Sequence, residues 1–577
     1  MRTIVRFLKP YKGLFALSLF FTVADVIGAL IIPTLTAQMI NIGVETRNLE
    51  YILRKGLVMM AVTALAGLSA LAGSYLCAKL SANVGKDMRN ALYRKSLSLS
   101  VHDFEQLGTG SMITRTLNDV SVIQQALVWC IQMVLPVPAL AAVGIMMAYS
   151  IDASMGWMLF GAVLFVIGLA LFVGRKASVI FEQMQHFMDR MNGVLRENIT
   201  GVRVIRAFRK EKHERKRMGK SFADYAQAAV KTNYLFAALD SLSFFAISIL
   251  IVAILWIGGN RIGMGRMQIG DITALTEYTI LILFYLMMAQ MVMILLPRAR
   301  VCLGRIEQVL KWNPEIVDAD GQRRALAPAG EEVARFQNVS FRFADADEDT
   351  LGNLSFRCLR GQTTAVIGGT GSGKSTVAKL LMRFHDVTAG EVLLKGTDIR
   401  TMSQQQLREH ISYVPQRAWL FSGTVAENLR FGNRTATEEE MYHALEVAQA
   451  GFVRELPRGL DAYVAQGGAN FSGGQKQRLS IARALMKKAD LYIFDDSFSA
   501  LDVKTDSQLR RALAGEMKDC AVLIIAQRIS TILHADQILV LHDGRAVGIG
   551  SHEELMKNCL VYQEIARSQM KGGEAGV

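Results

Sequence analysis

Long uncharged stretches dominate the amino-terminal half of the chain. Residues 13–36 are interrupted only by Asp25. Five further stretches contain no charged residue, namely Gly56–Ala78, Val120–Ile151, Ala153–Gly174, Ser241–Asn260 and Tyr278–Pro297. Because a helix needs about 20 mostly apolar residues to cross a bilayer, this pattern predicts six membrane spans.

Basic residues between the spans indicate their orientation. Residues 1–12 hold four Lys or Arg and no acid, 79–119 hold six against four acids, and 175–239 hold fourteen against six. Since cytoplasmic loops carry the excess of Lys and Arg, both termini and the two long loops are predicted to face the cytoplasm. Apolar positions recur in those loops at helical spacing, which predicts helical extensions into the cytosol.

The pattern changes after the last span. Pro and Gly residues mark 313–332 as a linker between a transmembrane domain, 1–312, and a second domain, 333–577. In the second domain short β-prone runs alternate with helical stretches, which is typical of an α/β domain.

Composition and charge agree with this division. Hydrophobic residues make up 51% of the 577 residues although 20% are charged, and mean hydropathy is +0.25. The net charge of +13 could indicate nucleic-acid binding. However, the basic residues flank apolar spans and no nucleic-acid-binding module is visible. We therefore predict a lipid bilayer as partner and no nucleic acid.

A glycine-rich turn in the second domain carries the strongest chemical signal. Gly368–Thr376 reads GGTGSGKST and fits the phosphate-loop pattern, between a β-prone run at 364–367 and a helix start at 376–383. Such glycines let backbone N–H groups converge on phosphate oxygens. Lys374 would reach the β- and γ-phosphates, and the Ser375 hydroxyl would bind Mg²⁺. The expected nucleotide-binding residues of the loop are Gly368, Thr370, Gly371, Ser372, Gly373, Lys374, Ser375 and Thr376.

Other segments place polar residues where strands end or helices begin. Gln416 follows a strand-like run directly, and Asp495 ends a buried one, where it could hold Mg²⁺. The next buried run, 521–526, is followed by Gln527. Asn470–Arg478 is a second glycine turn that opens a helix and favours anion binding.

In order, these segments resemble the ATP-binding domain of ABC transporters, and nearly all of residues 1–565 resembles a bacterial ABC exporter half-transporter. FSGGQ at Phe471–Gln475 matches the signature of that family. The resemblance implies that Phe343, otherwise a core residue of the alternating run 336–343, stacks on adenine. It implies that Ser375, Gln416 and Asp495 are the metal ligands. It also implies that Ser472, Gly473, Gly474 and Gln475 contact an ATP, and that Ser499–Asp502 is the D-loop.

The resemblance extends to the membrane half. Phe104–Gly110, with Arg115 and Asp119, resembles the first coupling loop of such exporters, and Glu197–Phe208 resembles the second. In the family these loops dock on ATP-binding domains. The implied fold is an all-α six-helix transmembrane domain plus a cytoplasmic α/β P-loop ATP-binding domain, in a multi-pass protein of the cytoplasmic membrane.

Three positions depart from the family pattern. Asp496 stands where the family usually has a general-base Glu, Gln527 where it usually has His, and Gln466 where it usually has Glu before the signature. Because the positioning of a base is worth orders of magnitude in rate, Asp496 and Gln527 are expected to be degenerate catalytic positions. This site should bind ATP with Mg²⁺ well and hydrolyse it poorly.

The intact signature then predicts a heterodimer whose other half-transporter supplies the competent residues. A homodimer in which Asp and Gln are slow but sufficient is the alternative. We predict ATP-driven export of amphipathic, drug-like small molecules by alternating access. Export of a lipid or peptide remains open, as does a regulatory subunit that binds ATP and gates its partner.

Overall fold

The computed structural model describes residues 2–318, 330–344 and 346–574, which divide into two compact units. The first unit comprises Met1–Ser98 and Leu107–Asn313, and the second comprises Leu99–Gln106 and Pro314–Val577. Most of the linker expected at 313–332 lies outside the described residues, so its limits stay a prediction.

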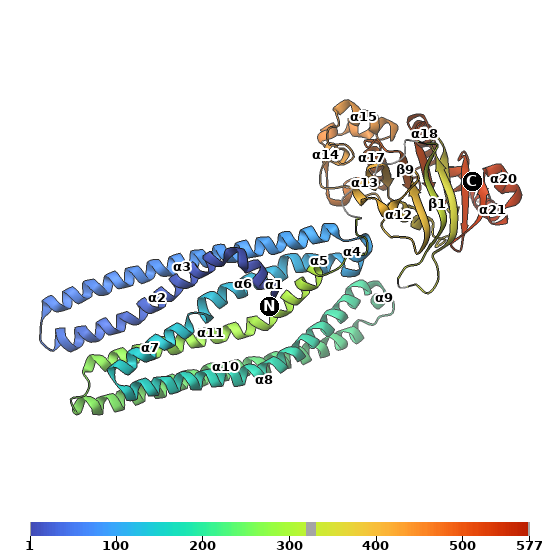
Figure 1. Ribbon diagram of the computed structural model, residues 1–577. Helices are drawn as coiled ribbons and strands as arrows, with labels where there is room; N and C mark the ends of the chain where they lie inside the picture. The colour runs from blue at the N-terminus through green and yellow to red at the C-terminus, as the bar shows by residue number, and fades with distance from the viewer. Residues whose placement is uncertain (1, 319–329, 345, 575–577) are drawn as a thin grey trace. The chain divides into compact units, whose positions relative to one another are not determined.

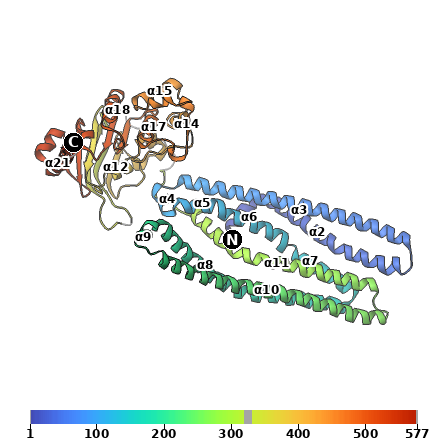
Figure 2. The same cartoon turned by 180° about the vertical axis from the view of Figure 1, so that it is seen from behind.

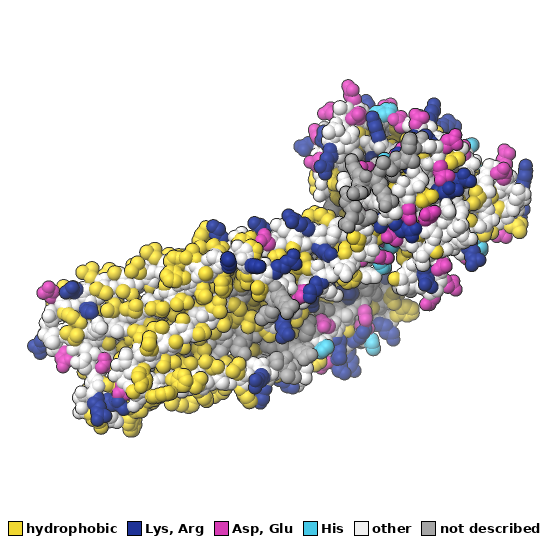
Figure 3. Space-filling model, viewed as in Figure 1, with side chains coloured by type: hydrophobic (Ala, Val, Ile, Leu, Met, Phe, Trp, Pro, Cys, Tyr) yellow, Lys and Arg dark blue, Asp and Glu magenta, His cyan; other side chains and the backbone are white. Residues whose placement is uncertain are grey.

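The first unit is a bundle of long helices (Figures 1 and 2). Six helical segments of the described chain are long and apolar enough to cross a membrane, as predicted: Thr3–Val44, Leu49–Ser98, Thr109–Ile151, Ala153–Lys176, Glu211–Gly263 and Ile269–Leu310. Only 6% to 40% of the most apolar stretch of each segment is buried within the unit. Most apolar side chains therefore face outward, which suits hydrocarbon surroundings, and Figure 3 shows them covering much of the bundle.

The individual helices of this unit have the following bounds: α1 (Arg2–Leu8), α2 (Lys12–Gln38), α3 (Leu49–Ser98), α5 (Thr109–Thr114), α6 (Val120–Trp129), α7 (Val137–Ile151), α8 (Ala153–Thr200), α9 (Val202–Ala207), α10 (Glu211–Gly263) and α11 (Ile269–Leu310). Helix α10 has 53 residues and α3 has 50. At 1.5 Å per residue each is about 75–80 Å long, far more than the bilayer core of about 30 Å. The prediction that the long loops extend the spans as helices is confirmed.

The third span is not one continuous α-helix. A π-helical turn, Cys130–Val134, follows α6, and Pro136 precedes α7. Proline lacks the N–H that an interior helical residue donates, which favours a helix boundary at this point.

The second unit is built on a six-stranded sheet with the order β12–β11–β3–β10–β9–β6. Its strands are β3 (Thr363–Gly368), β6 (Ile411–Val414), β9 (Leu491–Asp495), β10 (Ala521–Ile525), β11 (Gln537–His542) and β12 (Arg545–Gly550). All neighbouring pairs are parallel except β11 with β12. The carboxyl ends of β3, β6, β9 and β10 therefore share one edge of the sheet, which favours a site in the loops that follow them.

A four-stranded antiparallel sheet has the order β2–β1–β4–β5. Its strands are β1 (Glu332–Phe341), β2 (Leu351–Leu359), β4 (Ala389–Leu394) and β5 (Thr397–Asp398), and a third, two-stranded sheet pairs β7 (Gly423–Thr424) with β8 (Tyr463–Val464). One apolar core joins side chains of both larger sheets, such as Phe336, Leu354 and Leu523.

Helices cover the second face of the six-stranded sheet, where another core contains Phe494, Val522 and Leu509. The helices of this unit are α4 (Val101–Leu107, which reaches one residue into the first unit), α12 (Lys374–Leu381), α13 (Gln404–Glu409), α14 (Val425–Arg430), α15 (Glu438–Val447), α16 (Phe452–Glu455), α17 (Gly473–Leu485), α18 (Val503–Glu516), α19 (Ile529–Ile532), α20 (His552–Asn558) and α21 (Leu560–Glu574). Parallel strands with covering helices confirm the predicted α/β class.

Candidate nucleotide-binding site

The phosphate loop connects β3 to α12 through backbone geometry that only glycine adopts easily. Gly371 and Gly373 have φ values of +83° and +91°. A Cβ atom on Gly373 would also lie 2.8 Å from the Thr350 carbonyl oxygen and 2.7 Å from Leu351 Cδ2. One on Gly368 would overlap the Leu541 carbonyl oxygen. The turn can therefore place its N–H groups close together, as phosphate binding requires.

The Lys374 side chain lies across this loop, and the residue is 8% exposed. Its Nζ donates hydrogen bonds to the carbonyl oxygens of Gly368, at 2.9 Å, and Gly369, at 2.6 Å. Burial lowers the pKa of Lys374, and the nearby carboxylates of Asp496 and Asp495 oppose that shift. The side chain is thus held at the loop, where a phosphate group could replace the two carbonyl partners.

Three oxygen-bearing side chains meet at the carboxyl end of β9. Ser375 Oγ donates to Asp495 Oδ1 at 3.0 Å, and the Tyr413 hydroxyl donates to Asp495 Oδ2 at 3.3 Å. Burial raises the pKa of Asp495, the Ser375 and Tyr413 hydrogen bonds lower it, and the charge of Asp496 raises it again. Hydroxyl and carboxylate oxygens are ligands that Mg²⁺ prefers, so this donor set fits a magnesium ion held beside the phosphate loop.

The third expected metal ligand, Gln416, has a different partner. Its Nε2 donates to Asp496 Oδ2 at 3.1 Å, and the same oxygen accepts a second bond from Gln527 Nε2 at 3.0 Å. The loops that follow β6, β9 and β10 are therefore tied together at one carboxylate oxygen. Asp496 has a φ of +47°, a left-handed conformation that Asp tolerates better than most side chains.

Other expected loop residues are placed less distinctively. Ser372 Oγ donates to the Gly369 carbonyl oxygen at 2.9 Å, Thr376 is buried and Thr370 is exposed. Phe343 is half-buried, and its ring lies 4.8 Å from that of Phe341 and 5.3 Å from that of His385, edge-on to both. Its contact with adenine stays a prediction.

The signature segment forms the start of α17. Ser472 Oγ accepts a hydrogen bond from the Gln475 N–H at 3.3 Å, and Gln475 Oε1 accepts one from the Ser472 N–H at 2.9 Å. This capping box fixes the helix start and leaves Ser472 and Gly473 exposed. A Cβ on Gly474 would lie 3.3 Å from the Ala500 carbonyl oxygen, so the D-loop packs against this turn.

One contributor to this unit was not predicted. Tyr413 begins the run whose Gln416 was singled out, but its hydroxyl contact with Asp495 joins two strands and no local pattern marks it. Leu99–Gln106, which overlaps the segment Phe104–Gly110 that resembles a coupling loop, groups with this unit. There Asp103 Oδ2 accepts from the N–H groups of Ser100, at 3.0 Å, and Glu315, at 3.2 Å.

Comparisons with known proteins agree with this arrangement. Residues 15–287 match the model of the ABC transporter transmembrane region, and residues 351–499 match the model described as ABC transporter. An uncharacterized ABC transporter ATP-binding protein of Mycobacterium tuberculosis is 37% identical over 573 residues, 99% of this chain and 98% of that protein. A Bacillus subtilis protein, also described as an uncharacterized ABC transporter ATP-binding protein, is 33% identical over 573 residues, which cover 99% of this chain and 98% of that protein.

More distant similarities cover the chain equally fully. The ATP-dependent lipid A-core flippase of Albidiferax ferrireducens is 28% identical over 571 residues, 98% of this chain and 97% of that protein. The solved structure of a bacterial Atm1-family ABC exporter with ATP bound shares the fold, with a TM-score of 0.79 at 24% identity over 97% of this chain and 98% of that one. With its six spans fused to one ATP-binding domain, the chain belongs to the ABC transporter family, as an exporter-type half-transporter of the cytoplasmic membrane.

Proposed function

We propose that this half-transporter works in a heterodimer in which its own ATP site is catalytically weak and its signature segment serves the site of the partner. ATP-driven export and dimerisation follow from membership of the family. The asymmetry and the cargo are our proposal. We assign the cargo to amphipathic, drug-like small molecules.

The hydrogen bonds to Asp496 Oδ2 carry the proposal. A general base must present a free lone pair to the attacking water, and Asp496 Oδ2 already accepts bonds from Gln416 and Gln527, which leaves only Oδ1 for that role. Asp is also one methylene shorter than Glu, which withdraws the carboxylate from the water. Gln527 cannot become a cation, so it contributes no charge to stabilise the γ-phosphate.

The residues of this chain then have distinct tasks. Lys374 and the loop N–H groups bind and orient the phosphates, and Ser375 and Asp495 would hold Mg²⁺. When bound, the ion neutralises charge on the β- and γ-phosphates. The exposed Ser472–Gln475 turn closes over the nucleotide on the partner subunit, which contributes the efficient hydrolytic site.

Steady-state ATPase activity tests this proposal. The chain purified alone is compared with the chain purified together with a half-transporter expressed beside it. Negligible turnover alone and robust turnover together are expected. Comparable turnover alone, abolished by Asp496→Asn, would establish a homodimer in which Asp496 is a true base.

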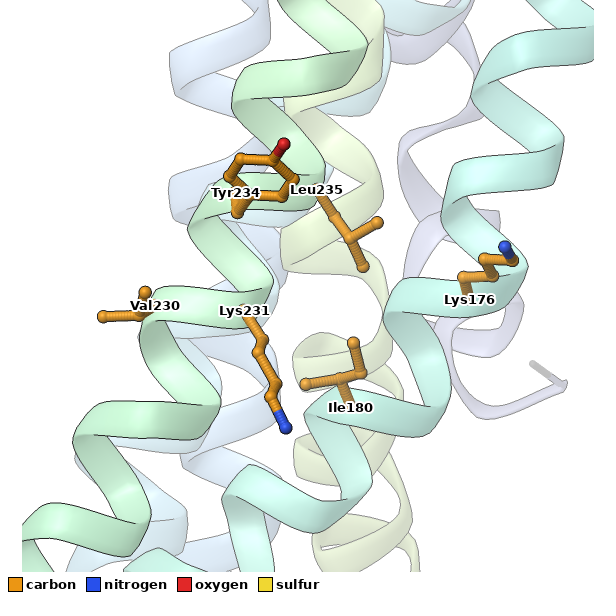
Figure 4. Close-up of a pocket in the computed structure, with 6 residues that line it drawn as sticks. All are labelled: Lys176, Ile180, Val230, Lys231, Tyr234 and Leu235. Carbon is orange, nitrogen blue, oxygen red and sulfur yellow. The ribbon is translucent and has the colours of Figure 1, made fainter.

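A lipid cargo is the second candidate. A groove of about 600 Å³ lies between α8 and α10, lined by Lys176, Ile180, Val230, Lys231, Tyr234 and Leu235 (Figure 4). Lys231 and Ile180 extend toward each other across it. The aliphatic stems of the two lysines lie beside apolar side chains in this groove, at the cytoplasmic end of a span, where their ammonium groups could pair with an anionic headgroup. One relative is named a lipid A-core flippase.

The two cargo classes are distinguished by the lipid dependence of turnover. In nanodiscs, a lipid exporter should gain ATPase activity when anionic phospholipid replaces zwitterionic lipid, and Lys176→Ala with Lys231→Ala should remove the gain. A drug exporter should instead respond to amphipathic compounds in either lipid.

A further inference from the structure

The ATP-binding unit contains a second pocket, whose lining shares no residue with the nucleotide-binding residues named above. It has a volume of about 580 Å³ and lies between α18 and the segment from α19 to Asp536, beside Gly361–Thr363 at the start of β3. Small-molecule sites commonly occupy roughly 300–1,000 Å³. The phosphate loop follows the opposite, carboxyl end of β3. We call this cavity the α18–α19 pocket.

The floor of the α18–α19 pocket is apolar. Phe494 on β9 is the register partner of Ile524 on β10, and Val522 lies two residues earlier on the same strand. Because side chains alternate along a strand, all three point to one face of the sheet. Leu513 and Met517 of the α18 region complete this surface. A ligand that fills the pocket would therefore bury an apolar body.

Arg510, one of the cations that line the pocket, already has hydrogen-bond partners on both walls. Arg510 Nη2 lies 3.1 Å from Asp506 Oδ2, and Arg510 Nη1 donates to the Ser530 carbonyl oxygen at 3.0 Å. The acid of the opposite wall is also engaged, because Asp536 Oδ2 accepts from the Thr363 N–H at 2.8 Å. Arg510 is therefore paired with a carboxylate, whereas Asp536 keeps its negative charge on the opposite wall.

Two further cations of the wall have no such partner. Within the part of the chain that the structure describes, neither Arg511 nor Lys518 makes an ion pair or a side-chain hydrogen bond. Both are exposed and, together with Ala514, recur at a spacing of three and four residues, which places them on one side of α18 and its end. Two unpaired positive charges therefore stand beside an apolar floor.

We propose that the α18–α19 pocket binds an amphipathic anion, with its carboxylate or sulfonate at Arg511 and Lys518 and its apolar body on Phe494 and Ile524. The apolar floor selects against inorganic anions, which bury no hydrocarbon, and the two cations select against neutral aromatic compounds. The site is independent of whether the dimer is symmetric.

The test uses the full chain in nanodiscs and 2-naphthoate as the probe, with binding followed by ligand-observed NMR against empty nanodiscs. We expect saturable binding of 2-naphthoate, and binding at least about tenfold weaker for neutral 2-naphthamide. Arg511→Ala with Lys518→Ala should weaken 2-naphthoate binding by a similar factor. Arg458→Ala with Lys557→Ala removes two exposed cations elsewhere in the unit and should leave it unchanged.

A second variant fills part of the α18–α19 pocket and leaves Arg511 and Lys518 unchanged. Ala514→Trp places an indole in the pocket from an exposed helical position and should abolish 2-naphthoate binding while binding of a fluorescent ATP analogue persists. Saturating ATP should not displace the probe. Undiminished binding to either variant, equal binding of the amide, or displacement by ATP would overturn the proposal.

Discussion

Gln527 Nε2 donates a hydrogen bond to Asp496 Oδ2 at 3.0 Å. The resemblance implies that the family usually has His and Glu at these two positions, a group that can be protonated and a longer acid. Here a neutral amide meets a shorter acid, so the pair has no cationic member and a shorter reach. Under the proposed function, this position would still bind nucleotide and would turn it over slowly.

Asp496→Asn should lower the ATPase rate of the assembled dimer by less than about twofold, because a base contributes little where it is not used. Asn also tolerates the left-handed backbone at this position, which has a φ of +47°. Asp495→Asn is the contrasting variant and should weaken Mg·ATP binding at this site. A loss of about tenfold or more in Asp496→Asn would identify Asp496 as a working base.

The double variant Asp496→Glu with Gln527→His should raise the ATPase rate of the chain purified alone by at least about tenfold. It restores a longer acid and a group that can be protonated, at two positions already in contact. Each single variant should gain much less, because the two side chains act as a pair. An unchanged rate in the double variant would place the defect elsewhere in the site.

Gly373→Ala should abolish ATP binding at this site. Its φ of +91° costs a non-glycine residue about 1–3 kcal/mol, and its Cβ would press on the Thr350 carbonyl. Gly369→Ala is the matched control in the same loop, since a Cβ there meets nothing within 4 Å. Binding of a fluorescent ATP analogue distinguishes the two. Equal affinity in both variants would contradict the assigned geometry of the loop.

Ser472→Arg should cripple the efficient site of the dimer while ATP still binds to this chain's own phosphate loop. The change also removes a helix cap, which costs about 1 kcal/mol in stability. Ser551→Arg removes the equivalent capping box at the start of α20 and controls for that cost. Turnover should fall only in Ser472→Arg, and parallel losses would mean that lost stability alone explains the effect.

The buried ring of His385 is expected to make the folded chain less stable at acid pH. The ring is 4% exposed, and burial lowers its pKa, helped by the charges of Lys379 and His102 and opposed by Glu105. Below the ordinary value of 6.5 the unfolded chain takes up a proton that the folded chain refuses, so the stability present at higher pH is lost as the pH falls. His385→Phe should therefore show a smaller drop in melting temperature between about pH 7.5 and about pH 5.5.

His534→Phe is the matched control for that experiment, because His534 is exposed in the turn after α19 and its side chain has no hydrogen bond or ion pair within the described residues. Its melting temperature should fall with pH as much as that of the unchanged chain. An equal fall in all three proteins would remove His385 as the source of the acid sensitivity.

Much of the architecture could be predicted because its signals are local. Spans need about 20 apolar residues in a row, and the buried run that was predicted to end at Asp495 is the strand Leu491–Asp495. Likewise the glycine pattern of the phosphate loop reflects backbone conformations that the structure shows at Gly371 and Gly373.

The rest depends on contacts between distant segments, which no local pattern encodes. Gln416, Asp496 and Gln527 follow three different strands, and only the sheet order brings them to one carboxylate oxygen. The π-helical turn before Pro136 and the α18–α19 pocket likewise depend on how neighbouring elements pack. The asymmetry of the dimer concerns a second chain and stays a prediction.

The grouping of Leu99–Gln106 with the ATP-binding unit has a practical consequence for fragments. A soluble fragment that begins near Pro314 lacks the carboxylate of Asp103, which accepts the Glu315 N–H, and the ring of His102, 5.8 Å from that of His385. Such a fragment exposes surface that the intact chain covers. We therefore expect it to melt earlier and to be cleaved faster by proteases near His385, and adding a peptide of residues 99–106 should partly reverse both changes.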